Sequence, residues 1–465
     1  MEQSFKDFRR EILKATNKDT TGVILRYEEA EDEIREYLHD KISEELSDDI
    51  KTGKNENIKK DKEYLKKKQD KYRELIQEAI GIKEIKVKGY EGKKINDFIE
   101  EMVGEFAGWS ILEDARKDPE VSDIYVIKYD TIFVEKAGKN MKYPKTFRNP
   151  KHYEDVVKRL VDEAEGNKTI NSGDSKIVDF EIYQDRGNAI SPEVSPKGYS
   201  LTIRKHPKNH VTREQLISQN IMDERISDLL GTLIMGETNI ICAGITGSGK
   251  TTTIRALLDY YVAKANKRMI VCEDTQELFL QNEHTLELVT VKSDEPKTAV
   301  SLKDLIVTAL RLKPKYIVIG EVRGVEAEAA VEGMETGHSV ILTMHGGNVW
   351  NIVNRLVTKY LMVMPTLGID VVERIIGSAV DYIFIQDDIP GIGRKITSLN
   401  EINYDFNSRR VTSKTIFGYD FKDKTWVWKN GLGRDKVDKM LRRGISLEKL
   451  VPLMDEESKK TMKIA

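Results

Sequence analysis

A glycine-rich stretch between two apolar segments constrains this chain more than any other feature. Residues 244–251 read GITGSGKT and fit the pattern G-x-x-x-x-G-K-[S/T]. They follow the apolar run 239–243, which predicts a buried strand, and they precede a helical pattern over 252–258. Glycines let successive backbone N–H groups turn toward one phosphate group, and the helix N-terminus adds partial positive charge. The stretch therefore predicts a phosphate-binding loop, or P-loop.

The pattern also predicts what the loop residues hold. We expect Lys250 to reach the β- and γ-phosphates of ATP, and the Thr251 hydroxyl to be a ligand of Mg²⁺. ATP and Mg²⁺ are thus the predicted ligands of the site. The predicted nucleotide-binding residues are Gly244, Thr246, Gly247, Ser248, Gly249, Lys250, Thr251 and Thr252.

Hydrolysis also needs carboxylates, and two follow apolar strand-like runs after the loop. Glu273 ends the run 269–273, and Glu321 follows the run 316–320 in the position of a Walker-B acid. The carboxyl ends of parallel strands face one ligand crevice, so we expect both acids beside the nucleotide. Either could orient the attacking water, and Glu321 is the candidate for organising Mg²⁺. His345 ends a third run and is predicted to sense the γ-phosphate or to contact another subunit, more so than His338.

Composition limits the protein class. The chain has 465 residues and a formal net charge of −3, which gives no overall attraction to nucleic acid or to an anionic membrane. Its two cysteines, Cys242 and Cys272, lie in apolar runs and are predicted to be small core residues. No apolar run reaches 18 residues, and the first residues lack a signal peptide, so we expect a soluble cytoplasmic protein without a transmembrane segment.

The pattern changes along the chain and predicts its domains. A charged, mainly helical region covers 1–105, and a smaller α+β domain with short strands and one helix covers 106–205. A linker covers 206–211. Alternating helices and strands over 212–465 predict an α/β fold with a mainly parallel sheet, which is a RecA-like P-loop NTPase domain with a C-terminal extension.

Four ordered motifs together resemble the type II/type IV secretion ATPase superfamily. They are the Walker A stretch 244–252, the Asp box 273–278, the Walker B stretch 319–327 and the His box 336–345. Within the superfamily the chain is most similar to the CpaF/TadA branch of Flp-pilus assembly ATPases, through 201–205, 279–284 and 394–402. The absence of Cys-x-x-Cys pairs separates it from branches that carry a tetracysteine zinc site.

The resemblance implies a hexameric ATPase that works on an inner-membrane platform protein, with nucleotide bound between its two domains. The family's arginines from the N-terminal domain match Arg186 and Arg204, and Arg323 lies within the Walker B stretch. A guanidinium there would stabilise the charge that develops on the transferred phosphoryl oxygens. This sequence has Tyr183-Gln184-Asp185-Arg186 in place of the family's Asp-Gly-x-Arg turn.

We therefore expect a cytoplasmic, Mg-dependent ATPase that powers assembly of a type IV-like (Flp/Tad) pilus or a related secretion process, without direct nucleic-acid contact. One alternative is a RecA-like motor for conjugative DNA transfer or another nucleic-acid translocation. Another is a regulator that binds ATP as a switch. DNA-stimulated turnover would favour the first alternative, and lack of steady-state turnover would favour the second.

Overall fold

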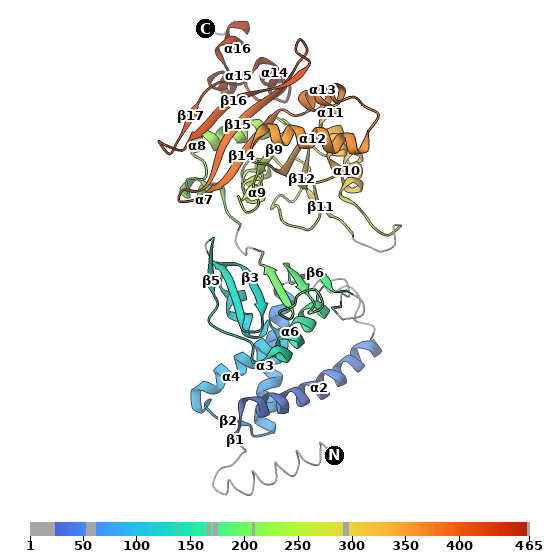
Figure 1. Ribbon diagram of the computed structural model, residues 1–465, viewed down its shortest axis with the longest axis vertical. Coiled ribbons are helices and arrows are strands. Elements are labelled where there is room, and N and C mark those ends of the chain that lie inside the picture. The colour runs from blue at the N-terminus through green and yellow to red at the C-terminus, as the bar shows by residue number, and fades with distance from the viewer. Residues whose placement is uncertain are drawn as a thin grey trace. The chain divides into compact units, whose positions relative to one another are not determined.

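The structure is a computed structural model that divides into two compact units, residues 1–208 and 209–465 (Figure 1). It describes residues 24–52, 62–136, 138–164, 169–170, 175–206, 210–291 and 297–462, without the side chains of 43–52 and 264. Part of the predicted linker, 207–209, lies outside these ranges. Each unit is described by itself.

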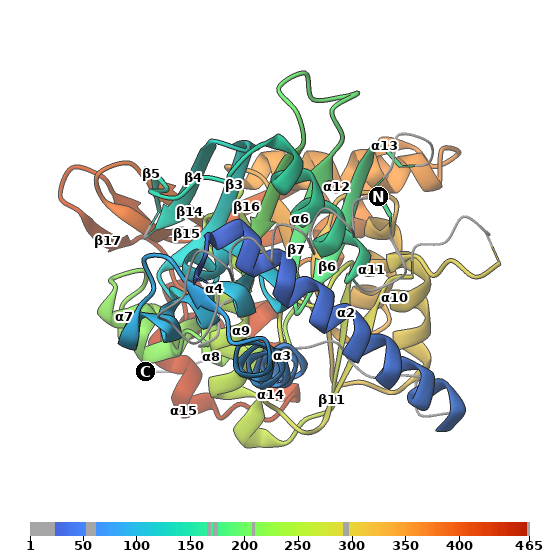
Figure 2. The same ribbon diagram turned by 90° about the horizontal axis from the view of Figure 1, so that it is seen from below.

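Three helices build the first part of the N-terminal unit. They are α2 (Tyr27–Thr52), α3 (Lys62–Ile82) and α4 (Ile95–Ala107). Figures 1 and 2 show α2 crossing α3 at a steep angle. Ile34, Ile76 and Phe98 are fully buried where these helices meet, although the helices are rich in charged residues. The described residues of this part are mainly helical, as predicted, and a short parallel pair, β1 (Ile24–Leu25) and β2 (Lys86–Val87), accompanies the helices.

The second part of the unit is a six-stranded antiparallel sheet of order β5-β4-β3-β8-β7-β6. Its strands are β3 (Val121–Lys128), β4 (Thr131–Lys136), β5 (Lys139–Lys142), β6 (Ile177–Ile182), β7 (Asp185–Ile190) and β8 (Ser200–Arg204). Helix α6 (Pro150–Asp162) begins where the Asn149 side chain accepts a hydrogen bond from the His152 N–H, with proline at its first position. The strands and the helix predicted here are confirmed. Leu65 of α3 shares the hydrophobic core of this sheet.

The hairpin between β6 and β7 turns in an unusual conformation. Tyr183 and Gln184 have φ values of 51° and 71°, so both lie in the left-handed region without a glycine. Two consecutive left-handed residues in a two-residue loop are the mark of a type I′ turn. The Tyr183 hydroxyl donates to Glu163 Oε2 at 2.6 Å, and this contact holds the turn against α6.

A nine-stranded sheet of order β11-β10-β12-β13-β9-β14-β15-β16-β17 forms the centre of the C-terminal unit. Its strands are β9 (Ile240–Gly244), β10 (Met269–Glu273), β11 (Thr285–Val289), β12 (Tyr316–Val322), β13 (Ser339–His345), β14 (Tyr382–Ile389), β15 (Gly393–Asp405), β16 (Arg410–Asp420) and β17 (Thr425–Trp428). The strands from β11 to β14 are parallel, as predicted.

Helices cover both faces of this sheet because both faces of the parallel strands are apolar. Ile241 and Ala243 of β9 face one hydrophobic core, whereas Ile240 and Cys242 face the other. The first core is covered by α10 (Leu302–Arg311), α11 (Glu326–Glu335), α12 (Val349–Val363) and α13 (Ile369–Ala379). The second is covered by α8 (Glu224–Met235), α9 (Lys250–Tyr261) and α14 (Arg434–Arg442). Both cysteines are buried and free, as predicted.

The alternating helix and strand pattern predicted up to residue 465 is wrong beyond β14. Strands β15, β16 and β17 follow one another through short connections and pair antiparallel. Hairpins need no crossover helix, so a meander extends the parallel sheet. The chain ends in α15 (Leu447–Leu450) and α16 (Glu456–Thr461), after the short α7 (Arg213–Ser218) opens the unit. In the described part of the chain no helix is long and apolar enough to span a bilayer.

A buried ion pair attaches the C-terminal helices to the sheet. The Asp381 carboxylate, 3% exposed, accepts from the Asn239 N–H at 2.7 Å and from Lys436 Nζ at 2.9 Å, and Lys439 donates to its second oxygen. The two lysines hold the pKa of Asp381 below its usual value despite its burial, which alone would raise it. Helix α14 is thereby fixed to the start of β14.

Candidate nucleotide-binding site

The P-loop joins β9 to α9 with the backbone that the glycines permit. Gly247 and Gly249 have φ values of 80° and 90°, which side-chain-bearing residues rarely adopt. A Cβ at Gly244 would lie 1.9 Å from the backbone oxygen of Gln386, so this glycine is required by a close approach of β14. Lys250 is the first residue of α9, which places the helix N-terminus at the loop.

Lys250 is buried and turned toward the loop itself. Its ammonium donates to the backbone oxygens of Gly244 at 3.2 Å and Ile245 at 3.0 Å, and it lies 3.4 Å from His345 Nδ1. Burial lowers the pKa of Lys250, while nearby acids, Glu321 and Glu277 among them, act in the opposite direction. The cation is therefore held in the loop by backbone oxygens that a bound phosphate would replace.

Glu321, Arg323 and His345 meet beside this lysine. Strands β12 and β13 are parallel neighbours, and His345 is the register partner of Gly244. His345 Nε2 lies 2.5 Å from Glu321 Oε1, and Arg323 donates to Glu321 Oε2 at 2.5 Å. The hydrogen bond from Arg323 to Glu321 raises the pKa of the Arg323 guanidinium. One continuous polar chain thus runs from the P-loop lysine through the histidine to the Walker-B acid.

Glu273 lies one strand further away and is enclosed. It is 2% exposed, and its Oε1 accepts from the backbone N–H groups of Glu277 at 3.1 Å and Leu278 at 3.2 Å. Burial raises the pKa of Glu273 to about 8, although these two hydrogen bonds lower it in part. A Cβ at Gly320 would lie 2.9 Å from the Glu273 Cγ, so glycine before Glu321 makes room for this carboxyl.

The hydroxyl groups of the loop fit a polyphosphate. Ser248 Oγ and Thr253 Oγ1 are buried and have no hydrogen-bond partner in the part of the chain that the structure describes. Thr246 is exposed in the turn, and Thr251 and Thr252 are half-buried in the first turn of α9. Buried hydroxyls without partners are costly, and oxygens of a bound nucleotide would satisfy them. Thr251 and Glu321 are the oxygen ligands that could hold Mg²⁺ with a nucleotide.

Gln386 is a residue of this site that the sequence pattern did not reveal. Its Nε2 donates to the backbone oxygen of Ser248 at 2.6 Å, and a Cβ at Gly249 would lie 3.1 Å from that nitrogen. The strand pairing between β14 and β15 shifts register between Ile385 and Gln386, and this irregularity lies beside the loop. A lone glutamine at the end of a strand carries no signal of such a contact.

Arg186 and Arg204 belong to the N-terminal unit, and the P-loop residues belong to the C-terminal unit. They are register partners on β7 and β8, and Asp123 of β3 is the next partner in the same row. Arg204 Nε donates to Asp123 Oδ1 at 2.9 Å, and the Arg204 side chain is 63% exposed. Asp185, the first residue of β7, separates the turn at Tyr183 and Gln184 from Arg186.

Comparison with known proteins gives one family and several relatives. Residues 110–389 match the family model described as "Type II/IV secretion system protein". The chain is 35% identical to protein MJ0900 of Methanocaldococcus jannaschii over 252 residues, which is 54% of this chain and 45% of that protein. It is 28% identical to the conjugal transfer protein TrbB of Rhizobium radiobacter over 249 residues, 53% of this chain and 72% of TrbB. The chain thus spans less than half the length of MJ0900.

A solved structure also aligns with the chain. The X-ray structure of the ATPase DotB from Legionella pneumophila is 23% identical, covers 64% of this chain and 81% of DotB, and has a TM-score of 0.44.

Proposed function

Because the chain belongs to the type II/IV secretion system protein family, we propose that it is an ATP-hydrolysing motor. The observation that carries the proposal is the convergence of Lys250, His345, Glu321 and Arg323 on one P-loop. Binding of a nucleotide by a P-loop needs no more than the loop, whereas hydrolysis needs a carboxylate and cations at the γ-phosphate end. Direct contacts join all four of these side chains in the C-terminal unit.

The position of each side chain indicates its role in binding and hydrolysing ATP. Lys250 would leave the oxygens of Gly244 and Ile245 for the β- and γ-phosphates, and Arg323 would stabilise charge on the phosphoryl oxygens. Thr251 and Glu321 would hold Mg²⁺, the latter through water. The metal, when bound, neutralises the negative charge of the β- and γ-phosphates. His345, between Lys250 and Glu321, would report the state of the γ-phosphate to the Walker-B acid.

Of the two acids, Glu321 is the better candidate to orient the attacking water. Its carboxylate contacts His345, which in turn contacts Lys250, and its side chain is 19% exposed. Glu273 holds backbone N–H groups of residues 277–278 and keeps its proton at neutral pH in this structure, because its pKa is about 8. We assign Glu273 to positioning the loop that follows β10.

The finer proposal is a hexamer that powers assembly of a type IV-like (Flp/Tad) pilus, or a related secretion process, through an inner-membrane platform protein. Arg186 and Arg204 would be delivered from the N-terminal unit to the nucleotide when the units close. Their common row on β7 and β8 supports a joint role, since both guanidinium groups can then approach one anion. Localisation at the cytoplasmic side of the membrane, through partners, is part of this proposal.

Steady-state ATP turnover by the purified full chain tests the motor. Lys250→Ala should leave a folded protein without ATPase activity, and His345→Ala should lower kcat more than it raises KM. The matched controls are Lys422→Ala, at an exposed position, and His338→Ala, at a half-buried position outside the contacts of Lys250, and both should keep turnover. Turnover by folded Lys250→Ala at the wild-type rate would refute the P-loop assignment.

The similarity to TrbB supports a second candidate, a motor for conjugative DNA transfer. Direct DNA tracking predicts turnover that rises with added single-stranded DNA and falls steeply with salt. Turnover that responds to lipid or platform protein and ignores DNA would favour the pilus motor.

A further inference from the structure

Large apolar side chains are exposed in the turn between α12 and α13. Residues 361–369 read LMVMPTLGI, contain no charged residue, and join the end of α12 to the first residue of α13. Met362, Met364 and Ile369 in this run are 63%, 40% and 56% exposed. Neighbouring exposed apolar residues are rare on a globular domain unless they contact a partner, so this turn indicates an interaction surface.

The β15–β16 hairpin brings a further apolar side chain to the same end of α13. A Cβ at Gly377 of α13 would lie 3.2 Å from Val411 Cγ2 of β16. One turn nearer the start of α13, Glu373 accepts from Arg410 Nη1 at 3.2 Å. The hairpin therefore lies along α13 with its turn toward the start of the helix, and Figure 1 shows the two side by side. Phe406, in the turn of the hairpin, is 73% exposed.

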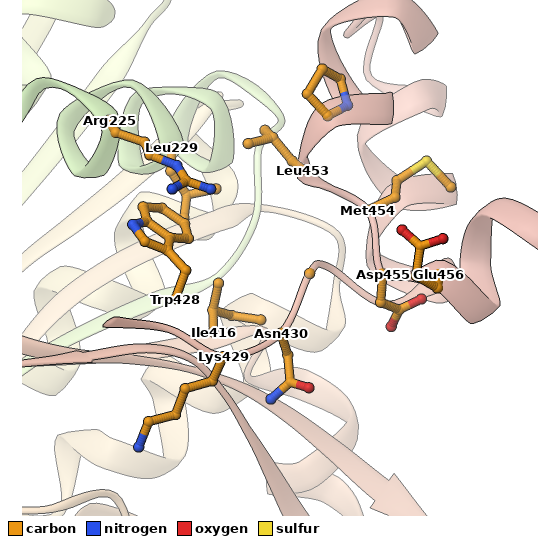
Figure 3. Close-up of a pocket in the computed structure, with 12 residues that line it drawn as sticks. Arg225, Leu229, Ile416, Trp428, Lys429, Asn430, Leu453, Met454, Asp455 and Glu456 are labelled. Atoms are coloured by element: carbon orange, nitrogen blue, oxygen red, sulfur yellow. The ribbon is translucent and has the colours of Figure 1, made fainter. Parts of the chain in front are cut away.

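These side chains project from the surface. Exposed fractions of 63% for Met362 and 73% for Phe406 leave most of each side chain outside the protein. Trp428, on the edge strand of the same sheet, is covered instead: Figure 3 shows the Arg225 guanidinium of α8 over its ring, 3.7 Å from the ring centre. Projecting apolar side chains suit a partner that they can penetrate, such as a lipid layer.

Polar groups beside the projecting side chains are paired within the chain. The Met364 N–H donates to the Tyr360 oxygen at 2.9 Å, and the Leu367 N–H donates to the Met364 oxygen at 3.1 Å. In the hairpin turn, Asp405 Oδ1 accepts from the Asn407 N–H at 2.9 Å. Internal pairing of this kind favours contact with hydrocarbon, because lipid tails offer no hydrogen-bond partners.

Basic side chains accompany the apolar ones. Arg355 is exposed on α12, about two turns before Met362 and on the same face, and Arg409 is exposed in the hairpin turn. Asp370, which follows Ile369, is an exposed acid, so the two arginines outweigh it. Cations next to an apolar tip fit a layer whose headgroups are anionic.

We propose that Met362, Met364, Ile369 and Phe406, the apolar tips of the C-terminal unit, insert into the surface of an anionic lipid bilayer. Arg355 and Arg409 would then contact the headgroups. A bilayer fits these observations better than a protein partner, because lipid receives projecting side chains without a matching set of pockets. The contact lies outside the P-loop residues and does not depend on hydrolysis.

Sedimentation of the full chain with vesicles of phosphatidylcholine and phosphatidylglycerol tests the proposal. Met362→Ser and Phe406→Ser should each weaken binding about 10-fold, the order expected when one large apolar side chain no longer enters lipid. Arg409→Gln should weaken binding about fivefold, and vesicles of phosphatidylcholine alone should bind less than the mixture. The matched controls are Val427→Ser, 42% exposed on β17, and Lys424→Gln in the β16–β17 turn, which should each change binding less than about twofold.

A fluorescent label measures the insertion directly. Both native cysteines are buried, so Met362→Cys, Phe406→Cys and Val427→Cys each provide one accessible thiol for an environment-sensitive dye. With vesicles, the dye at positions 362 and 406 should brighten and shift to shorter wavelength, whereas the dye at position 427 should not.

Three results would overturn the proposal. They are a wild-type chain that does not bind the vesicles, full binding by the Met362→Ser/Phe406→Ser double variant, and dyes at 362 and 406 that respond to protein concentration without vesicles. The last result would assign the apolar tips to a contact between copies of the chain. The substituted side chains are all exposed, so each variant should keep the melting temperature of the wild type.

Discussion

Replacing the buried Glu273 by glutamine should stabilise the C-terminal unit by an amount that grows with pH. Burial raises the pKa of this carboxyl from 4.5 to about 8. Between pH 4.5 and about 8, Glu273 therefore keeps its proton in the folded chain and has released it in the unfolded chain. Glutamine keeps the oxygen that accepts from the N–H groups of Glu277 and Leu278 but carries no charge.

Proton linkage gives the sign and the size. Because the folded pKa is raised, the stability contributed by the protonated Glu273 is fully present below pH 4.5 and is lost as the pH rises to about 8. Each pH unit within this window changes the free energy of unfolding by about 1.4 kcal/mol for one proton. The wild type should thus lose about 3 to 5 kcal/mol across the window relative to Glu273→Gln.

Urea unfolding without nucleotide or Mg²⁺, followed by tryptophan fluorescence, measures the difference. Three tryptophans, at 350, 426 and 428, report on the C-terminal unit. The two proteins should unfold at similar urea concentrations at about pH 5, and the variant should be more stable by several kcal/mol at about pH 9. A Glu283→Gln control, at an exposed position, should show no such trend. Equal differences at both pH values would refute the burial of a protonated Glu273.

Three other substitutions test the packing. Asp381→Asn should destabilise the C-terminal unit by about 3 to 5 kcal/mol in urea unfolding, since it leaves Lys436 buried without its anion; adding Lys436→Met should recover most of the loss. Gln184→Gly should raise the melting temperature of the N-terminal unit by relieving a left-handed residue, worth about 1 kcal/mol; a lower melting temperature would exclude the type I′ turn. Gly320→Ala should cost about 1 to 3 kcal/mol in thermal unfolding through its clash with Glu273, and wild-type stability would contradict that contact.

The sequence pattern predicts the site best where the residues that form it are close together in the sequence. The succession of a strand, a glycine-rich loop and a helix predicts the P-loop. This prediction is possible because the left-handed glycines and the helix N-terminus depend only on a few consecutive residues. Parallel strands end at the same edge of a sheet, which predicts Glu321 and His345 near Lys250, and contacts join the three residues. The rule did not distinguish Glu273 from Glu321, since their difference is burial by other parts of the chain.

Contacts between distant segments were beyond prediction. Gln386 reaches Ser248 across 138 positions of sequence, and the close approach that demands Gly244 comes from the same strand. The antiparallel pairing of β15 to β17 departs from the predicted alternation of helices and strands, since strand direction depends on the connections between strands. The stacking of Arg225 on Trp428 joins a helix and a strand that no motif connects.

The position of β14 has a mechanical consequence. This strand is hydrogen-bonded to β9 on one side and to β15 on the other, and its Gln386 holds the loop that ends β9. A ladder of backbone hydrogen bonds loaded along its strands resists shear collectively, so it deforms little. A force applied at β17 would therefore be transmitted through four strand pairs to the P-loop. In the other direction, a displacement of the P-loop would move β17 at the edge of the sheet.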